Sequence, residues 1–294
     1  MRKLQILYHP EHPAEVSTLE AVIGEKDFSE KFAEHDRIFI DSLWADWKNA
    51  KGDLIFSSPG NLGTLFDIRG SLFLYQPTEF KVYLATSSSY PQKSLSPLIY
   101  DSLRTSVVGA AVFTADEKIF IQRRPETATH APGFLDSSVA GFCHPSPDGK
   151  LSFLDALLEK LSRELHIREE EIASIALTGA HSSPYPDFSG SFAFKVSTSL
   201  ESGSLKERIN HYYIASHDFI SPQELPGFIL RHYALSQDMI GEGCAVLLSS
   251  LEYPLFQETV RRINKYERKI VFGTLKKGTF IEQPLSFSAD ERIP

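Results

Sequence analysis

Residues 153–167 read FLDALLEKLSRELHI, and this stretch decides the fold that the sequence predicts. Its leucines recur at intervals of three and four residues, which places them on one face of an α-helix. That face is predicted to be buried, whereas the charged residues between the leucines point elsewhere. The leucines are Leu154, Leu157, Leu158, Leu161 and Leu165.

The segments on both sides of this helix have the pattern of β-strands. Two strands joined by a turn at 115–117, a loop with proline and glycine, and a third short strand precede it. Together with the strands and helices that follow, they predict an α/β fold, a mixed sheet sandwiched by helices. The strands are predicted at 106–114, 118–123, 138–141, 172–180, 190–196 and 212–215, the helices near 223–233 and 242–266, and a hairpin at 269–274 and 279–283.

The first hundred residues predict a smaller α+β region. Aromatic and aliphatic residues at helical spacing predict a helix over 28–50, and short apolar runs separated by glycine and proline predict strands. A connection rich in serine and proline follows at 87–97. We therefore predict an N-terminal α+β region over 1–104 and a domain over 105–294 that includes the C-terminal helices and hairpin. The N-terminal strands are predicted at 54–56, 65–68, 72–75 and 80–85.

Composition limits the classes of function. Lys and Arg total 30 against 38 Asp and Glu, so the net charge of −8 argues against a broad nucleic-acid surface. The longest apolar run, 107–113, is far too short to span a bilayer. Cys143 and Cys244 stand too far apart in the chain for a cysteine zinc motif, and two cysteines make no disulfide scaffold. We expect a soluble cytoplasmic protein that acts on a small molecule, without nucleic-acid or membrane partners and with its oligomeric state open.

The order of strand, strand, Pro-Gly loop, strand and amphipathic helix resembles the core of the Nudix superfamily. The resemblance covers about Thr105 to Ser197 and rests on IFIQRR at 119–124, on APGFLDSSVAG at 131–141 and on the leucine-rich helix. It implies a Nudix-like domain that cleaves a pyrophosphate bond with Mg²⁺ or Mn²⁺. Nudix helices hold these ions with glutamates, because carboxylates one helical turn apart supply hard oxygen ligands on one face.

This chain departs from the Nudix box at most of its metal-binding positions. In the best register, Lys160 stands on the first box glutamate, Arg163 on the next and Leu151 on the upstream one. Glu164 alone remains as the implied metal ligand and catalytic residue, with Glu159 as a candidate displaced partner. The other explanation is structural: Glu159 with Arg163, and Lys160 with Glu164, form i,i+4 ion pairs on a solvated face, each worth about 0.2–0.5 kcal/mol.

The resemblance leaves three functional hypotheses. The favoured one is a Nudix-like hydrolase of a nucleoside-diphosphate-linked compound. A similarity to atypical UDP-glucose pyrophosphatases, in LWADW at 43–47 and in Thr114–Asp116, implies a UDP-sugar as its substrate. The alternative is a catalytically inactive Nudix-fold protein that binds a nucleotide or a protein partner. A minor alternative is an isopentenyl-diphosphate isomerase-like enzyme, which Cys143–Pro145 resembles.

Several residues outside the helix are candidates for substrate binding. Arg123 and Arg124 end a predicted strand at the mouth of the expected cleft, where a guanidinium can grip a phosphate through two hydrogen bonds. We expect one to face the site and the other to pair at the surface. Asp187 is a candidate nucleoside contact or late metal ligand, with turn capping as the other explanation. Aromatic residues offer rings for stacking on a base, or else pack in the core: Phe188, Phe192, Phe194, Tyr212 and Tyr213.

Overall fold

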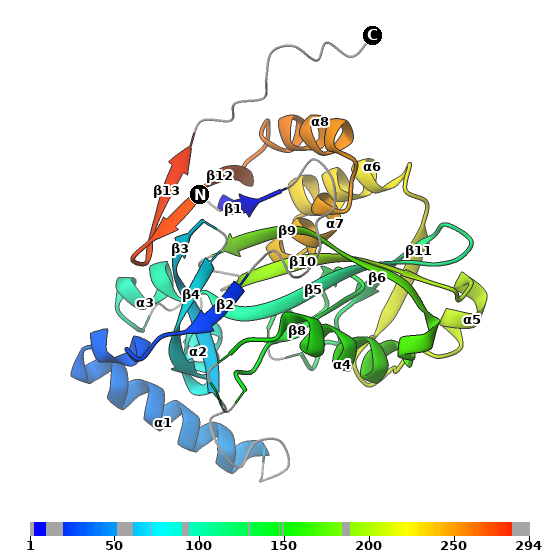
Figure 1. Ribbon diagram of the computed structural model, residues 1–294. Helices are drawn as coiled ribbons and strands as arrows, with labels where there is room; N and C mark the ends of the chain where they lie inside the picture. Colours follow the sequence, from blue (N-terminus) through cyan, green and yellow to red (C-terminus); the bar gives the residue numbers. More distant parts are fainter. Residues whose placement is uncertain are drawn as a thin grey trace.

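The computed structural model describes residues 3–9, 20–51, 61–70, 72–89, 94–128, 130–146, 148, 150–183 and 189–283. Within these residues a thirteen-stranded mixed sheet runs through the molecule, with helices packed on both of its faces (Figure 1). The predicted fold class, an α/β protein with a mixed sheet sandwiched by helices, is confirmed.

The main path of the sheet has the order β13-β12-β1-β9-β10-β5-β3-β4-β2, and β6, β7, β8 and β11 branch from it. The strands are β1 (Lys3–Tyr8), β2 (Glu20–Ile23), β3 (Asn61–Arg69), β4 (Leu72–Glu79), β5 (Thr105–Phe113), β6 (Ile119–Arg123), β7 (Leu135–Asp136), β8 (Val139–Phe142), β9 (Ile172–Ser183), β10 (Ser189–Thr198), β11 (Ser216–Ile220), β12 (Lys269–Lys276) and β13 (Thr279–Gln283). The α-helices are α1 (Glu34–Lys51), α2 (Phe80–Ser89), α3 (Pro97–Ser102), α4 (Phe153–Leu165), α5 (Ser202–Lys206), α6 (Leu225–Ile229), α7 (Gly241–Ser249) and α8 (Tyr253–Ile263). Shorter 3-10 turns occupy Phe28–Lys31 and Glu169–Glu171, and a π-helix occupies Leu230–Leu235.

Strand β5 lies at the centre of the sheet and is buried on both faces. It pairs in parallel with β10 along its whole length and antiparallel with β8. Its sequence, TSVVGAAVF, is apolar almost throughout, which is typical of a strand covered by helices on both sides. At Gly109 a Cβ atom would lie only 2.5 Å from Cγ2 of Val246, so glycine is what allows α7 to approach β5 this closely.

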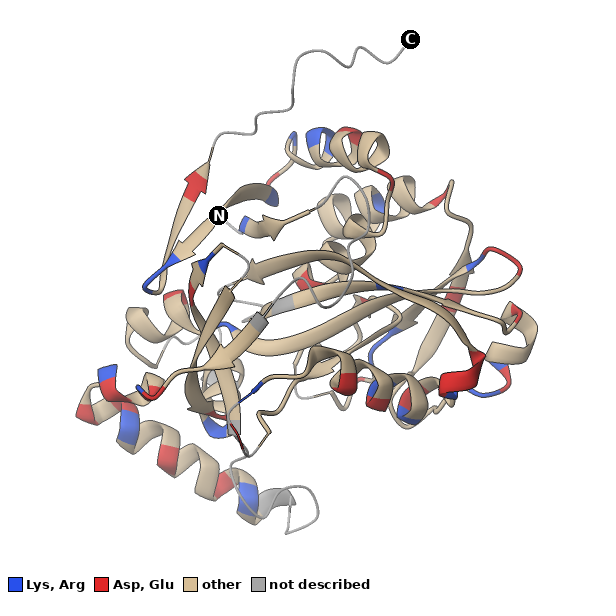
Figure 2. Cartoon of the chain, in the orientation of Figure 1, with Lys and Arg blue, Asp and Glu red and all other residues tan. Residues whose placement is uncertain are grey.

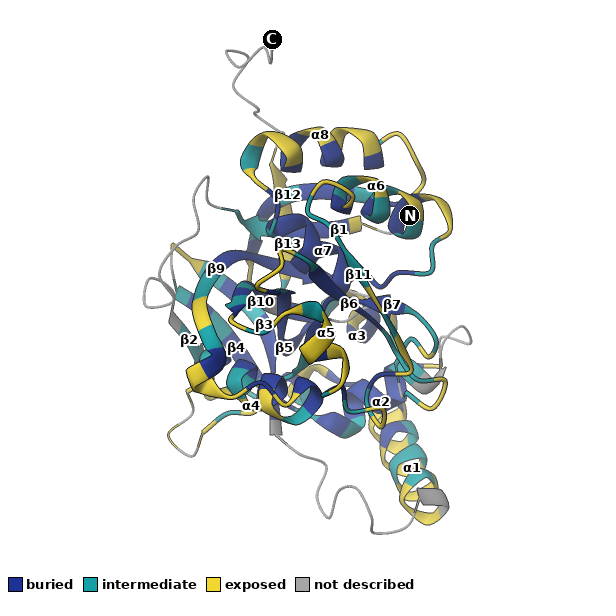
Figure 3. Cartoon of the chain, turned by 90° about the vertical axis from the view of Figure 1, so that its right-hand side faces the viewer, coloured by how far each residue is buried: buried dark blue, intermediate teal, exposed yellow. Residues whose placement is uncertain are grey.

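Two hydrophobic cores lie against the sheet, and many of the strand and helix segments that contribute to them are coloured as buried in Figure 3. On one face, Leu157, Leu161 and Leu165 of α4 are fully buried against β5, β8 and β10. On the other face, α7 is buried over its whole length, and α8 covers it. The leucine spacing at 153–167 therefore predicted α4 correctly, but Leu154 and Leu158 are only half-buried, and two charged residues expected to point elsewhere, Lys160 and Glu164, are buried.

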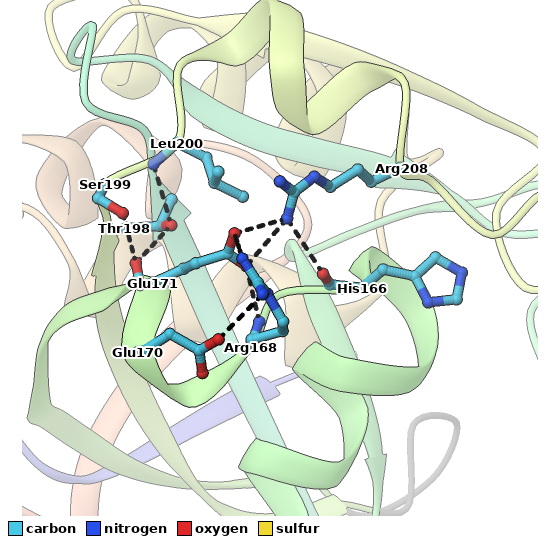
Figure 4. Close-up of polar contacts among 8 residues, drawn as sticks. All are labelled: His166, Arg168, Glu170, Glu171, Thr198, Ser199, Leu200 and Arg208. Carbon is cyan, nitrogen blue, oxygen red and sulfur yellow. Dashed lines mark hydrogen bonds and ion pairs between the residues drawn. The ribbon is translucent and has the colours of Figure 1, made fainter.

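A small polar cluster around Glu171 lies next to the C-terminal end of α4 (Figure 4). The Glu171 carboxylate accepts hydrogen bonds at 2.8 Å from both Arg168 and Arg208, and these hydrogen bonds lower the pKa of Glu171 to about 2. Its main-chain oxygen accepts a hydrogen bond from Oγ1 of Thr198 at 2.8 Å. The cluster thus connects the start of β9 to the end of β10 and to the segment after α5.

Strands from the first 104 residues join the sheet at two separate places. β1 lies between β12, its parallel neighbour, and β9, its antiparallel neighbour. β3 meets β5 at Thr64 and Thr105 and carries β4 and β2 beyond it. The described strands of 1–104 and 105–294 thus belong to one sheet, and a domain boundary near residue 104 stays a prediction.

Some predicted elements differ from those in the structure. Residues 80–85, predicted as a strand, begin the helix α2, because a short apolar run fits a buried helix that packs on α1 as well as it fits a strand. The strand predicted at 212–215 begins only at Ser216, where β11 pairs with β6. The helices predicted at 223–233 and 242–266 are divided, the second at residues 250–252, just before Pro254 in the first turn of α8. The strand predicted at 54–56 lies outside the described residues.

Of the described helices, none combines the length and the apolar character that crossing a bilayer requires.

The imidazole of His181 is buried in the middle of the sheet, opposite Ile6 of β1 and Ser191 of β10. Neither ring nitrogen finds a hydrogen-bond partner among the described residues. Burial lowers the pKa of His181 from 6.5 to about 4, because the charged ring would lose its hydration. Between these two pH values the unfolded chain binds the proton more readily than the folded chain, so folding loses stability as the pH falls.

We expect His181→Leu to flatten the acid side of the stability curve. The leucine fills a similar volume without a group that must be charged in acid. In the wild type, His181 should lower the free energy of unfolding by up to about 1.4 kcal/mol per pH unit as the pH falls from 6.5 to 4. Urea unfolding at a series of pH values should show a smaller decrease for His181→Leu. Replacement of the exposed His211 by leucine serves as the control and should leave the slope unchanged. If the free energy of unfolding fell equally steeply with pH in the wild type and in His181→Leu over this range, the acid sensitivity would not come from His181.

Candidate functional site

A cavity of about 740 Å³ opens between α4, β8, α2 and the segments that follow β6 and precede β11. Five charged side chains line it, and five aromatic residues are among the other residues of its wall. The charged residues are Arg124, Lys160, Arg163, Glu164 and Glu242, and the aromatic residues are Phe80, Tyr83, Phe142, Tyr212 and Tyr213.

Helix α4 contributes three of the charged groups. Lys160, Arg163 and Glu164 are spaced by three and four residues, so they share the face of α4 that looks into the cavity. Lys160 is 7% exposed and Glu164 5%, whereas the Glu159 side chain is 60% exposed and lies outside the cavity lining. This helix carries both acidic and basic residues (Figure 2). The solvated-face explanation therefore holds for Glu159 but not for Lys160 or Glu164.

The guanidinium of Arg163 joins the outer and inner carboxylates of α4. Its Nη1 donates to Oε1 of Glu159 at 2.9 Å, and its Nη2 donates to Oε1 of Glu164 at 3.2 Å. The same guanidinium lies 4.8 Å from the ring centroid of Tyr213, within cation–π range. The predicted i,i+4 ion pair of Glu159 with Arg163 is thus present.

Burial shifts the acid–base equilibria of the two inner groups toward their neutral forms. Burial raises the pKa of Glu164, against the opposing effect of Lys160 and Arg163. Burial also lowers the pKa of Lys160, and Arg163 lowers it further, while the charge of Glu164 works in the opposite direction. The cavity therefore places an ammonium and a carboxylate in a poorly hydrated wall.

Arg124 lines the cavity from the end of β6. Its Nη1 donates to Oδ2 of Asp136 at 2.9 Å, and its Nε donates to the main-chain oxygen of His130 at 3.0 Å. Asp136 is fully buried because β7 pairs with β6 and sets Asp136 opposite Gln122. Burial and the nearby Arg124 charge lower the pKa of His130 to about 3.

Arg123 turns away from the cavity. Its Nη1 donates to the main-chain oxygen of Gly133 at 2.6 Å, and its Nη2 lies 3.5 Å from Oδ2 of Asp238. Of the two arginines proposed for substrate binding, the structure brings only Arg124 into the cavity lining. Asp187, the third candidate, lies outside the described residues.

The donor set of this cavity does not fit a divalent metal ion. Mg²⁺ and Mn²⁺ prefer several oxygen ligands, usually carboxylates. Among the described residues no group of three or more Asp, Glu, His or Cys side chains is arranged to hold an ion. Beside Glu164, the positions on which the Nudix resemblance expects acids carry Lys160 and Arg163, whose charges repel a cation.

Several lining residues were not among the sequence-based candidates. Glu242 opens α7, and Tyr83 and Phe142, whose ring centroids are 4.9 Å apart, come from α2 and β8. No motif connects these distant segments, so only the fold brings them together. Lys160 did carry a signal, because a basic residue stood where the family has an acid. Of the predicted stacking rings, Tyr212 and Tyr213 line the cavity, Phe192 and Phe194 belong to the core, and Phe188 lies outside the described residues.

The solved structures that resemble this chain include two that are distant in sequence. No family model matches the chain, and no curated protein matches it. The solved structure of DR0079 from Deinococcus radiodurans is 19% identical, with a TM-score of 0.36 over 49% of this chain and 80% of that one. That of a MutT protein from Methanosarcina mazei Go1 is 13% identical, with a TM-score of 0.35 over 53% of this chain and 92% of that one. Neither similarity assigns a family, an activity or a ligand to this chain.

Removal of the Asp136 carboxylate should destabilise the fold. Asp136→Ala leaves the Arg124 guanidinium without its buried counter-ion, and we expect a loss of about 3 kcal/mol in urea unfolding. This is the lower end of the range for buried pairs, because the Arg124 side chain is 25% exposed. The double variant Arg124→Met with Asp136→Leu removes both charges and should lose less. If the free energy of unfolding of Asp136→Ala lay within 1 kcal/mol of the wild-type value, this ion pair would not be important for stability.

Proposed function

We propose that this cavity binds a nucleoside-diphosphate-linked compound. The observation that carries the proposal is the set of three cations, Arg124, Lys160 and Arg163, in one cavity that aromatic residues also line. Ammonium and guanidinium groups form strong charge-assisted hydrogen bonds with phosphate oxygens. Two carboxylates, Glu164 and Glu242, line the same cavity, so the cations are in excess.

The aromatic rings suit the nucleoside part of such a ligand. Tyr212 is 75% exposed at the cavity, and its ring meets Tyr213 edge to face at a centroid distance of 4.9 Å. An exposed ring beside a cation offers a surface on which a base can stack. Tyr213 in turn is covered by the guanidinium of Arg163, which connects the stacking surface to the phosphate-binding groups.

Metal-dependent hydrolysis of a UDP-sugar-like compound is the second candidate function. It is favoured by the buried carboxylate of Glu164, which lines the cavity as the proposed catalytic residue and metal ligand. The outward position of Glu159 and the cations beside Glu164 favour binding without cleavage.

The position of Cys143 does not support the isomerase hypothesis. Burial raises the pKa of Cys143 to about 12, and its Sγ donates to the main-chain oxygen of Ser152 at 3.4 Å. Cys143 does not line the cavity. A thiol held neutral and covered in this way is a core residue.

The two candidate functions differ in the products that they form. Incubation of the protein with UDP-glucose, ADP-ribose or a dinucleoside polyphosphate plus Mg²⁺ or Mn²⁺ should give thermal stabilisation by a ligand without phosphomonoester products. Product formation that disappears in Glu164→Gln would instead establish the hydrolase. Product formation that survives in Glu164→Gln would point to a contaminating enzyme.

Loss of the Tyr212 ring should weaken the binding of a nucleotide more than that of a bare phosphate chain. Tyr212→Ala is expected to lower the affinity for a nucleoside diphosphate by about 1–3 kcal/mol, because stacking on the base is lost. The affinity for inorganic pyrophosphate should stay the same in calorimetric titrations. Tyr212→Phe keeps the ring and Tyr266→Ala removes a ring elsewhere on the surface, and both should bind like the wild type. Equal losses for nucleotide and pyrophosphate in Tyr212→Ala would contradict stacking.

A further inference from the structure

We infer that the cavity binds its diphosphate without a divalent metal ion, with the Lys160 ammonium as the principal cation on the phosphate oxygens. This inference rests on the proposed function and deepens it. It follows from where Lys160 lies, from what surrounds its ammonium group and from the donor set of the cavity.

The stem of Lys160 is held between α4 and β8. A Cβ atom on Gly141 would clash with Cε of Lys160 and lie 2.9 Å from its Nζ, so the lysine passes directly over this glycine. Lys160 and Gly141 both line the cavity, and Lys160 is only 7% exposed. The backbone of β8 and the helix therefore confine the stem, which brings the ammonium to the cavity wall.

The ammonium of Lys160 differs from the other two cations in its surroundings. Arg124 donates to Asp136 and His130, and Arg163 donates to Glu159 and Glu164. In the part of the chain that the structure describes, Lys160 makes neither an ion pair nor a hydrogen bond. A lysine ammonium carries three donors, and burying it without an acceptor costs free energy. An anionic ligand in the cavity would supply those acceptors.

A divalent metal ion at the same place would be repelled by the neighbouring cationic side chains. It would lie close to Lys160 and Arg163, with Glu164 and Glu242 as the carboxylates of the lining. A metal-free diphosphate instead brings negative charge to an ammonium that makes no direct ion pair with the described residues. Mg²⁺ in solution binds diphosphate and neutralises part of its charge, so it should compete with Lys160 for the ligand.

Calorimetric titration of the full chain separates these cases. UDP and inorganic pyrophosphate are the probes, each in buffer with EDTA and in buffer with excess MgCl₂. We expect both to bind in EDTA, with equal or lower affinity in MgCl₂. This comparison uses the unmodified protein, so it does not depend on the folding of any variant.

A pair of lysine variants assigns the effect to Lys160. Lys160→Met keeps the apolar stem and removes the charge, and it should weaken pyrophosphate binding in EDTA on the order of tenfold to a hundredfold. The matched control is Lys206→Met at an exposed lysine of α5 outside the cavity, which should bind like the wild type. Without ligand, Lys160→Met should melt at the same or a higher temperature than the wild type, because a buried charge without an acceptor is gone.

The outcomes distinguish this inference from the proposed function. Binding of UDP only in the presence of Mg²⁺ or Mn²⁺ would overturn the inference and leave the proposed function standing. Lys160→Met that binds pyrophosphate as tightly as the wild type would also overturn it. No binding of either probe in any buffer would overturn the proposed function itself, and with it the inference.

Discussion

The parallel pairing of β5 with β10 is the constraint on which the rest of the molecule depends. It fixes a strand that is buried on both faces, and α4 and α7 pack on those two faces. β8 pairs with the same strand on its other side and carries Gly141 to the position where Lys160 crosses it. The cavity is thus built by elements that β5 holds together, although their residues are distant in the sequence.

Charge at the cavity is distributed so that two of the three cations already have protein partners. Arg124 and Arg163 are engaged with carboxylates, which fixes their orientation. Hydrogen-bonded guanidinium groups lose little freedom when a ligand arrives, so they position an anion as well as attract it. Lys160 contributes charge without such a partner among the described residues. This division of roles explains how a protein with a net charge of −8 can hold a local site for anions.

The sequence predicted those elements that have a strong period. The leucine spacing predicted the helix α4, with three of its five leucines in the core, and the turn before Lys118 predicted the β5–β6 hairpin. The prediction of a strand at 80–85 was wrong because a short, largely apolar stretch of six residues has no periodicity that distinguishes a strand from a buried helix. Which of Arg123 and Arg124 faces the cavity could not be predicted, since it depends on the pairing of β7 with β6. The contribution of Glu242 and Tyr83 to the cavity depends on tertiary packing alone.

The position of β1 has a consequence for biosynthesis. This strand is synthesised long before one of its two neighbours, β12, which begins only at Lys269. Pairing across so many residues requires the closure of a very long loop, and such contacts form slowly. The nascent chain must therefore carry this strand without one of its neighbours until β12 has been synthesised. A chaperone that shields this segment during translation would have a physical reason to act.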